Sequence, residues 1–145
     1  MVYLLPMEYA TTSINDVKLY NLDAISDDRG LLTVLEIYKR FEIQLSRVFF
    51  IQTVGPTTRG GHAHRLCNQV FICNSGQINI SCSDSRKVAN YDLHDSKFAL
   101  FVPKGIWVEL DFQGPALITV LCDQPYIESE YIRNIESFNF EKSIL

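Results

Sequence analysis

The segment Arg59-Gly60-Gly61-His62-Ala63-His64 carries two histidines two positions apart, between predicted strands. Alternate residues of an extended chain point to one face, so the two imidazoles are expected to lie side by side. Imidazole gives and takes protons near neutral pH, because its unperturbed pKa is roughly 6.5, and it is also a common metal ligand. The pair therefore predicts either a metal site or an acid/base device.

The residues that follow the pair argue against a metal. His62-x-His64, four residues, Gln69, six residues and Gly76, and later Pro103-Lys104-Gly105-Ile106-Trp107-Val108, resemble in outline the two metal-binding motifs of cupin barrels. Those motifs have a glutamate at the Gln69 position and a histidine at the Val108 position. Only two of the four usual ligands remain, so we expect no bound metal or other cofactor, and assign His62 and His64 to acid/base catalysis.

The elements that must hold this pair are strands. Short runs of β-branched and aromatic residues recur between turn residues, which is typical of a sandwich or barrel. The predicted strands are 17–22, 31–37, 47–54, 68–74, 77–83, 88–93, 98–102, 108–112 and 116–122. Ser75-Gly76 predicts a tight hairpin turn, and the tail Glu128 to Phe140 a short helix or an irregular flap. The fold class expected is all-β, a double-stranded β-helix of the cupin or jelly-roll type.

Length and composition fit a single globular domain over residues 1–145, with 47% hydrophobic and 21% charged residues. The formal net charge is −4 and no basic cluster is present, so we expect no nucleic-acid partner. No apolar run approaches the roughly 18 residues of a membrane helix, so we expect no membrane partner. The four cysteines form no C-x-x-C pair and predict reduced, mostly buried thiols.

The first seven residues, Met1-Val-Tyr-Leu-Leu-Pro-Met7, lack the basic residues and the long apolar core of a secretory signal. The expected location is the cytoplasm.

Segments spread along nearly the whole chain resemble the sugar 3,4-ketoisomerases, cupin enzymes that act on dTDP-4-keto-6-deoxyhexoses. The matching residues are Asp28-Arg29-Gly30, Glu36, Arg47-Val48-Phe49, Arg59-Gly60-x-His62-Ala63-His64, Gln69, Cys73, Gly76, Trp107, Tyr126-Ile127-Glu128, Tyr131-Ile132-Arg133 and Phe138. The Arg-Gly-x-His-Ala-His and Tyr-Ile-Arg segments are specific when they occur together.

The resemblance implies a metal-free reaction in which the keto group of a dTDP-4-keto-6-deoxyhexose moves from C4 to C3, in the biosynthesis of unusual deoxy or amino sugars. The C3 proton lies α to the C4 carbonyl, so a base can remove it to give an enediol(ate), and reprotonation at C4 completes the isomerisation. His62 and His64 are expected to act as base and acid in either order. The sequence leaves open which C4 epimer, gluco or galacto, is formed.

The substrate-binding residues that we expect are Arg47, Arg59, Gln69, Trp107, Tyr126, Tyr131 and Arg133. Arg59 either stabilises the developing oxyanion or lies in a solvated loop. Arg47 either holds the pyrophosphate or forms a rim ion pair with Glu36 or Asp28.

The roles of the aromatic candidates and of Gln69 also have alternative interpretations. Trp107, Tyr126 and Tyr131 either stack on the thymine or pack in the core. Gln69 either orients a histidine or bonds a sugar hydroxyl, or it is purely structural.

Three departures from the family pattern stand out. Phe50 stands where many members carry a tyrosine, Glu128 and Glu130 stand where aspartates are usual, and Tyr38-Lys39-Arg40-Phe41 replaces a Pro-Phe stretch. The glutamates preserve charge, whereas Phe50 removes a phenol that could assist proton transfer.

Two other functions remain open: a dTDP-4-keto-sugar 3,5-epimerase, which also removes protons α to a carbonyl, and a non-catalytic ligand-binding cupin. The resemblance also implies a homodimer, with exchange of amino-terminal strands in which the apolar Tyr3-Leu4-Leu5 segment can take part.

Overall fold

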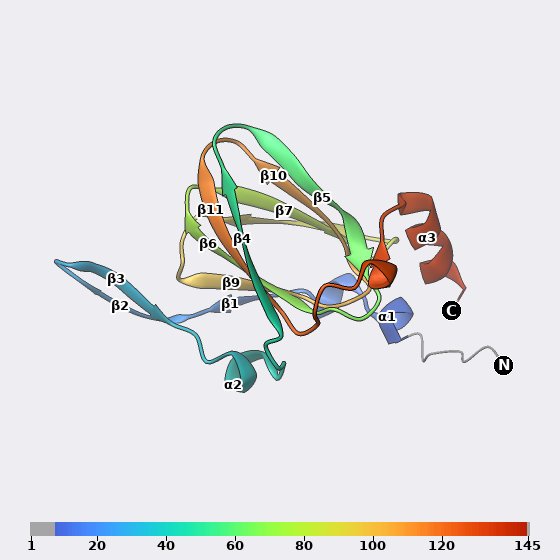
Figure 1. Cartoon of the computed structure of the whole chain (residues 1–145), viewed down its shortest axis with the longest axis horizontal. Coiled ribbons are helices and arrows are strands. Elements are labelled where there is room, and N and C mark those ends of the chain that lie inside the picture. The colour runs from blue at the N-terminus through green and yellow to red at the C-terminus, as the bar shows by residue number, and fades with distance from the viewer. Residues whose placement is uncertain (1–7, 145) are drawn as a thin grey trace.

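Two antiparallel five-stranded sheets pack face to face in the computed structural model, which describes residues 8–144 (Figure 1). One sheet has the order β1-β9-β6-β11-β4 and the other β12-β5-β10-β7-β8. A separate two-stranded hairpin, β2–β3, projects from one end. The segment Tyr3-Leu4-Leu5 lies outside the described residues.

The strands are β1 (Lys18–Asn21), β2 (Asp23–Asp27), β3 (Gly30–Val34), β4 (Arg47–Thr53), β5 (Thr57–His64), β6 (Gln69–Ser75), β7 (Ile78–Ser83), β8 (Val88–Leu93), β9 (Phe98–Val102), β10 (Trp107–Phe112), β11 (Ala116–Cys122) and β12 (Tyr131–Ile132). The helical segments are α1 (Glu8–Thr11), η1 (Ile14–Asp16), α2 (Ile37–Phe41), η2 (Glu128–Glu130) and α3 (Ile135–Ser143). No described helix has the length and apolar character needed to cross a bilayer.

Strands β4 to β11 form a jelly roll. Their order is β9-β6-β11-β4 in one sheet and β5-β10-β7-β8 in the other, so from β4 to β11 the chain crosses to the other sheet after every strand except β7, which forms a hairpin with β8. The predicted double-stranded β-helix is therefore confirmed.

Side-chain alternation explains why the two sheets stay together. Along β7, buried residues alternate with partly exposed ones, and Ile78, Ile80 and Cys82 point inward with no exposed surface. Phe71 on β6 and Ile118 on β11 reach the same core from the facing sheet. All four cysteines are buried and free, as predicted.

A β-bulge in β5 determines the direction of the side chains in the segment that carries the two histidines. Val108 of β10 pairs with His62, but the next residue, Glu109, pairs with Gly60, so β5 holds one extra residue at Gly61. Gly60 and Gly61 have φ angles of 84° and 73°, in the left-handed region that glycine adopts at little cost.

The bulge determines that the Arg59 side chain lies on the same face of β5 as His62. In a regular strand, residues three apart point to opposite faces. With the extra residue, Arg59 pairs with Leu110 and His62 with Val108, both of which point into the core. Arg59 and His62 therefore face the barrel interior together.

The carboxyl-terminal tail covers the outer face of β5. Ala63, Trp107, Ile132 and Phe138 form a second buried cluster with α1. The buried ammonium of Lys142 on α3 donates to the carbonyls of Tyr9, Thr12 and Gly105, at 2.6–3.1 Å. The tail is thus fixed against the barrel.

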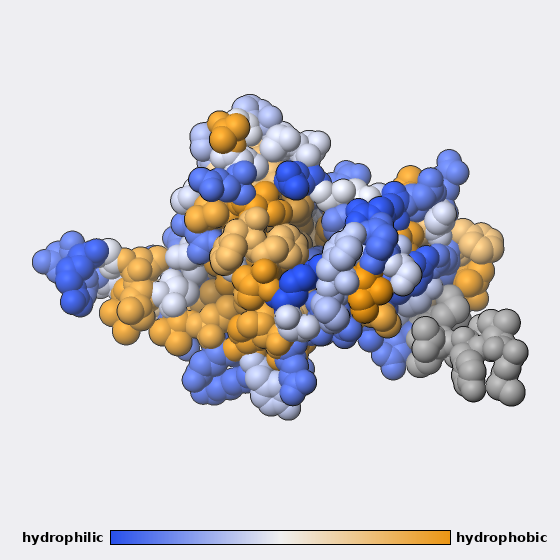
Figure 2. Space-filling view, in the orientation of Figure 1, coloured by the Kyte–Doolittle hydropathy of each residue, from blue (hydrophilic) through white to orange (hydrophobic). Residues whose placement is uncertain are grey.

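The β2–β3 hairpin is exposed along its length, with Ile25 and Leu32 paired on one face at 64% and 58% exposure. Figure 2 shows hydrophobic side chains continuing from this hairpin across the front of the barrel, where β4 forms the edge of its sheet. Such an unpaired apolar edge is unusual for a protein that acts alone.

All nine predicted strands are present, with small shifts at their ends. Three predictions were wrong, and β2 was not predicted at all. Ser75-Gly76 does not form a hairpin turn, because β6 and β7 lie in different sheets. Residues 57–64 were expected to lie between strands but form β5. Two glycines and five polar or charged side chains hide the strand pattern there. The predicted strand 31–37 ends at Val34, since Ile37 begins α2.

Substituting Gly60 should test the bulge. In Gly60→Ala the new Cβ would lie 2.9 Å from the Val108 carbonyl oxygen at a positive φ, so we expect the free energy of unfolding to fall by roughly 1–3 kcal/mol. Urea unfolding followed by the fluorescence of Trp107, the single tryptophan and a buried one, measures this.

The matched control is Gly55→Ala, where a Cβ meets nothing within 4 Å. Equal stability of the two variants would contradict the role assigned to the bulge.

Candidate active site

A cavity of about 570 Å³ opens into the barrel between β4 and β5. Its wall is Phe49, Phe50, Ile51, Gln52, Thr58, Arg59, Gly60, His62, Gln69, Phe71, Val108, Leu110 and Arg133. Apolar core residues form part of the wall, and polar side chains from both sheets form the rest. This is the usual composition of a small-molecule site.

His62 is the imidazole that lines this cavity. Its ring centroid lies 5.1 Å from that of His64 and 5.2 Å from that of Tyr131. Burial, and then the proximity of His64 and Arg133, lower the pKa of His62 to about 4. His62 is therefore neutral at pH 7 and can accept or donate a proton without a net charge on its resting form.

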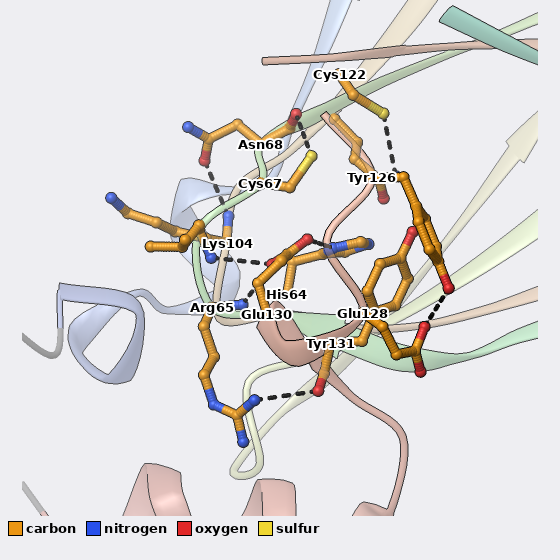
Figure 3. Close-up of polar contacts among 12 residues, drawn as sticks. His64, Arg65, Cys67, Asn68, Lys104, Cys122, Tyr126, Glu128, Glu130 and Tyr131 are labelled. Atoms are coloured by element: carbon orange, nitrogen blue, oxygen red, sulfur yellow. Dashed lines mark hydrogen bonds and ion pairs between the residues drawn. The ribbon is translucent and has the colours of Figure 1, made fainter. Parts of the chain in front are cut away.

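His64 lies deeper than His62 and its side chain is only 4% exposed. Its Nδ1 lies 2.5 Å from Oε1 of Glu130, and its ring centroid lies 4.3 Å from that of Tyr131 (Figure 3). Burial disfavours a charged Glu130, but hydrogen bonds from His64 and from the backbone hold the pKa of Glu130 below its ordinary value. His64 and Glu130 form a buried imidazole–carboxylate pair.

Three arginines surround the cavity. Arg59 and Arg133 line it directly. Arg133 also pairs with Glu128, with Nε 2.6 Å from Oε1, and its guanidinium lies over the Tyr131 ring at 4.3 Å. Glu128 accepts a further hydrogen bond from the Tyr126 hydroxyl.

Arg47 lies behind the residues that line the cavity. Its Nη2 donates to the Tyr131 hydroxyl at 3.4 Å and approaches Sγ of Cys122 at 3.7 Å. Glu36, one of its two expected ion-pair partners, pairs with Lys39 instead. Arg47 therefore supports Tyr131, which in turn contacts both histidines.

Gln69 lines the cavity opposite the histidines and is 2% exposed. Its Nε2 lies 3.5 Å from Sγ of Cys122, the residue with which it pairs across β6 and β11. The Oε1 acceptor and the second N–H of this amide remain to face a ligand.

Trp107 is the one predicted site residue that the structure does not bring to the cavity. It points to the outer face of β10, opposite Val108, is 7% exposed, and packs on Phe138 with ring centroids 5.7 Å apart. Strand alternation accounts for this, since adjacent residues must face opposite ways. Trp107 therefore packs against the carboxyl-terminal tail, in agreement with the packing role that was the alternative to thymine stacking. The other eight predicted residues lie at or directly behind the cavity.

Sequence reasoning assigned no role to Glu130, Cys122 or Phe50, although each lies at the site. Glu130 was recognised only as a glutamate in an aspartate position of the closing motif. Nothing local in the sequence indicates that it contacts a histidine 66 positions away. Phe50, 68% exposed, lines the rim of the cavity.

Within residues 8–144, one cluster has ligand-type atoms close enough for a metal: those of His64, Cys67 and Glu130 lie within 4.8 Å of one another. These atoms already bond within the protein, since Glu130 binds His64 and two backbone amides, and Cys67 donates to the Asn68 carbonyl. The residues at the two other cupin ligand positions, Gln69 and Val108, offer no strong ligand. The donor set fits proton transfer better than metal binding.

Comparison with known proteins agrees with this chemistry. Residues 15–143 match the protein family described as FdtA, WxcM-like, C-terminal. A TDP-4-oxo-6-deoxy-alpha-D-glucose-3,4-oxoisomerase from Aneurinibacillus thermoaerophilus is 32% identical over 123 residues, covering 83% of this chain and 88% of the relative.

Solved structures of similar proteins have the same architecture. A 3,4-ketoisomerase from Helicobacter canadensis superposes with a TM-score of 0.83 at 34% identity, over 88% of this chain and 97% of the other. A sugar 3,4-ketoisomerase from Thermoanaerobacterium thermosaccharolyticum in complex with TDP has a TM-score of 0.84 at 30% identity, over 89% and 96%. A histidine-to-asparagine mutant of that enzyme was solved with TDP-4-keto-6-deoxyglucose.

A dTDP-4-dehydrorhamnose 3,5-epimerase from Elizabethkingia anophelis shares the fold, with a TM-score of 0.71 over 83% of this chain and 75% of the other. Its identity is 18%, so the likeness concerns the fold alone.

The low pKa of His62 predicts a pH-dependent stability. Between its unfolded value of roughly 6.5 and its folded value of about 4, the unfolded chain binds a proton at this site that the folded chain does not. Stability is therefore lost as pH falls through this window, by at most about 3 kcal/mol from this group. In His62→Gln that part of the loss should disappear, as measured by urea unfolding at pH 6.5 and pH 4.5.

His94→Gln is the matched control, because His94 is exposed. It should keep the wild-type pH dependence. An unchanged loss of stability in His62→Gln would show that burial of His62 does not set its pKa.

Proposed function

The chain belongs to the FdtA family of sugar 3,4-ketoisomerases, and we propose from its cavity residues how it moves the keto group of a TDP-linked sugar. The protein is a TDP-sugar 3,4-ketoisomerase. The proposed substrate is a TDP-4-keto-6-deoxyhexose, the class bound by the Thermoanaerobacterium enzyme. The observation that carries the assignment of roles is the pairing of a neutral cavity histidine with a buried histidine–glutamate pair.

The reaction needs two proton transfers at carbon, each accompanied by one at oxygen, and no change in composition. A base removes the proton on C3, the electrons of that C–H bond form the C3–C4 double bond, and the C4 oxygen takes up a proton to give an enediol. The C3 hydroxyl then loses its proton as C4 gains one, which leaves the carbonyl at C3. Each transfer assisted by a positioned group is worth roughly 10²- to 10⁴-fold in rate.

His62 and His64 carry these protons in our proposal. They share one face of β5, so the two imidazoles can serve adjacent carbons of one sugar ring. The enediolate charge is stabilised by the guanidinium of Arg59, which the bulge turns toward the same side. Gln69 faces the sugar and bonds a hydroxyl with the amide atoms that do not contact Cys122.

The diphosphate is the anionic part of the substrate, and Arg59 and Arg133 are the cations that line the cavity. We assign the diphosphate to Arg133, because Arg59 stabilises the enediolate and a guanidinium group binds phosphate oxygens bidentately. Arg47 acts indirectly by holding the Tyr131 hydroxyl. For the thymine, Phe50 at the rim and the 59% exposed Tyr126 offer aromatic faces in place of Trp107.

We further propose that the protein is a homodimer in which the β2–β3 hairpin packs on a second copy. The hairpin exposes Ile25, Leu32 and Val34 on one face, and β4 exposes Val48 and Phe50 at an unpaired sheet edge. A second copy of the chain offers both surfaces at once, which a symmetric dimer can bury. The predicted cytoplasmic location rests on the amino-terminal sequence and stays a prediction.

Replacing either histidine should abolish most turnover and spare nucleotide binding. In His62→Asn and His64→Asn we expect kcat to fall by roughly 10²- to 10⁴-fold, because each removes a proton-transfer group. Affinity for TDP should change less than about threefold, because the nucleotide binds elsewhere in the cavity. NMR of the product formed from TDP-4-keto-6-deoxyglucose measures turnover and the configuration at C4, and calorimetry measures affinity.

His94→Asn is the control, since the third histidine is exposed on the segment after β8. An unchanged sugar with the wild-type protein, while TDP still binds, would favour a non-catalytic binding protein. An epimerised 4-keto sugar would favour a 3,5-epimerase.

A charge on the hairpin should break the dimer. Ile25→Arg places a cation on the apolar hairpin face and should yield monomers in sedimentation at micromolar concentration, because an unpaired buried charge is costly. Val88→Arg on β8, at the same 64% exposure, is the control and should keep the wild-type mass. A monomeric wild-type protein, or a dimeric Ile25→Arg variant, would contradict the proposed interface.

A further inference from the structure

Arg47 carries a positive charge without a carboxylate partner among residues 8–144. Its Nε atom is buried and has no hydrogen-bond partner there. The guanidinium lies over the rings of Phe49 and Tyr126, 5.6 Å from each ring centroid. A cation that is partly removed from water is costly unless an anion lies beside it. The groups that Arg47 contacts therefore indicate where that anion is.

Two groups accept hydrogen bonds from Nη2 of Arg47. One is the Tyr131 hydroxyl at 3.4 Å, and the other is Sγ of Cys122 at 3.7 Å. A thiol loses its proton more readily than a phenol, since their ordinary pKa values are roughly 8.5 and 10. Cys122 is therefore the better source of the negative charge that Arg47 needs.

Strand register places Cys122 between two donors. Cys122 on β11 pairs with Arg47 of β4 on one side and with Gln69 of β6 on the other. Paired residues point to the same face of a sheet, so the three side chains form a row inside the barrel. Nε2 of Gln69 lies 3.5 Å from the sulfur. A neutral thiol is a weak acceptor, whereas charge strengthens a hydrogen bond, so two N–H donors directed at one sulfur favour the thiolate.

The titratable group nearest to this sulfur is the thiol of Cys67, in the loop after β5. Hydrogen bonds from Cys67, and then from Gln69 and Arg47, hold the pKa of Cys122 below its ordinary value, although burial alone would raise it. The pKa of Cys67 is raised, first by its hydrogen bond to Cys122 and then by burial. The proton of the pair therefore stays on Cys67.

The two carboxylates of this region are engaged elsewhere. Asp123 accepts from the backbone and the side-chain amide of Asn68, at 2.8 and 2.7 Å. Glu130 lies 2.5 Å from Nδ1 of His64 (Figure 3). Neither forms an ion pair with Arg47, which leaves the sulfur as its counter-charge.

The same sulfur determines which atom of Gln69 faces the substrate. An amide can turn either its NH₂ group or its oxygen toward a neighbour. A negative sulfur attracts the NH₂ group and repels the oxygen, so Oε1 turns away from Cys122, toward the cavity that Gln69 lines. The cavity then receives an acceptor suited to a sugar hydroxyl.

We propose that Cys122 is a positioning residue of the ketoisomerase: its thiolate neutralises Arg47 and orients Gln69, so that Oε1 accepts from a hydroxyl of the sugar. This inference rests on the proposed function, in which Gln69 bonds that hydroxyl. Cys122 is 0% exposed and acts only through its neighbours. Because Arg47 holds the Tyr131 hydroxyl, the thiolate also secures the ring beside both histidines.

The ionisation of Cys122 is measurable without a substrate, because a thiolate absorbs ultraviolet light more strongly than a thiol. At pH 7.5 the difference spectrum between the wild type and Cys122→Ser should show about one thiolate per chain. The matched control is Cys82→Ser, another thiol with 0% exposure. Its difference spectrum should show no thiolate, since burial raises the pKa of Cys82 to about 12.

Three substitutions at Cys122 separate charge from packing. Cys122→Ser and Cys122→Ala carry no charge, so kcat/KM should fall roughly 10- to 10²-fold, the effect of a binding group misplaced by about 1 Å. Cys122→Asp restores an anion on a small side chain and should recover roughly fivefold or more of that loss. Cys82→Ser should keep the wild-type kcat/KM. The affinity for TDP, which lacks the sugar, should stay within about threefold in all variants.

A wild-type protein without a thiolate at pH 7.5 would overturn the proposal without any kinetic measurement. So would wild-type kcat/KM in Cys122→Ser and Cys122→Ala, or a folded Cys122→Asp protein no faster than Cys122→Ser. A loss of TDP affinity as large as the loss of kcat/KM would also overturn it, because the sugar contact would not be what was lost.

Failure of the proposed function looks different. A wild-type protein that binds TDP and leaves the keto sugar unchanged would refute the ketoisomerase assignment, whereas its ultraviolet spectrum would still report the charge on Cys122.

Discussion

A buried carboxylate is stable only where hydrogen-bond donors reach both of its oxygens. In this protein the buried carboxylate of Glu130 finds these donors on the segment around His64. Glu130 bonds His64 and the amides of Arg65 and Leu66, so the carboxyl-terminal tail and strand β5 have to meet at one place. Tyr131 and Arg133 follow directly in sequence, and the same junction brings them to the cavity. The position of the aromatic ring and of the guanidinium therefore depends on where the carboxylate is buried.

The second constraint is the bulge in β5. A strand offers every second residue to one face, which suits two histidines but would send Arg59 to the other side. One extra residue at Gly61 corrects this, and the positive φ angles of Gly60 and Gly61 make the correction possible at little conformational cost. The site thus combines a neutral imidazole, an imidazole–carboxylate pair and a cation on one face of a single strand.

The barrel around these groups supplies rigidity and a low dielectric. The apolar part of the cavity wall lowers the pKa of His62 to about 4, because burial penalises the protonated form. The same apolar surroundings strengthen the interaction between His64 and Glu130 relative to water. Proton transfer between carbon and nitrogen benefits from both effects, since neither imidazole is held as a solvated cation. The family membership of the chain and the chemistry of its cavity therefore support each other without a metal ligand set.

The sequence by itself indicated the all-β jelly roll, since nine short runs of β-branched and aromatic residues stand between turn residues. It also determined that His62 and His64 share a face, because residues two apart in a strand always do. Resemblance to the ketoisomerases selected seven more residues, of which six lie at or behind the cavity. Trp107 does not, because it neighbours the inward-facing Val108 and strand alternation points it outward. Only the tertiary structure decided that Arg59 faces the histidines, through a bulge whose register shift depends on β10. It alone also paired Glu130 with His64, because a contact across 66 positions depends on the path of the whole chain and leaves no local pattern.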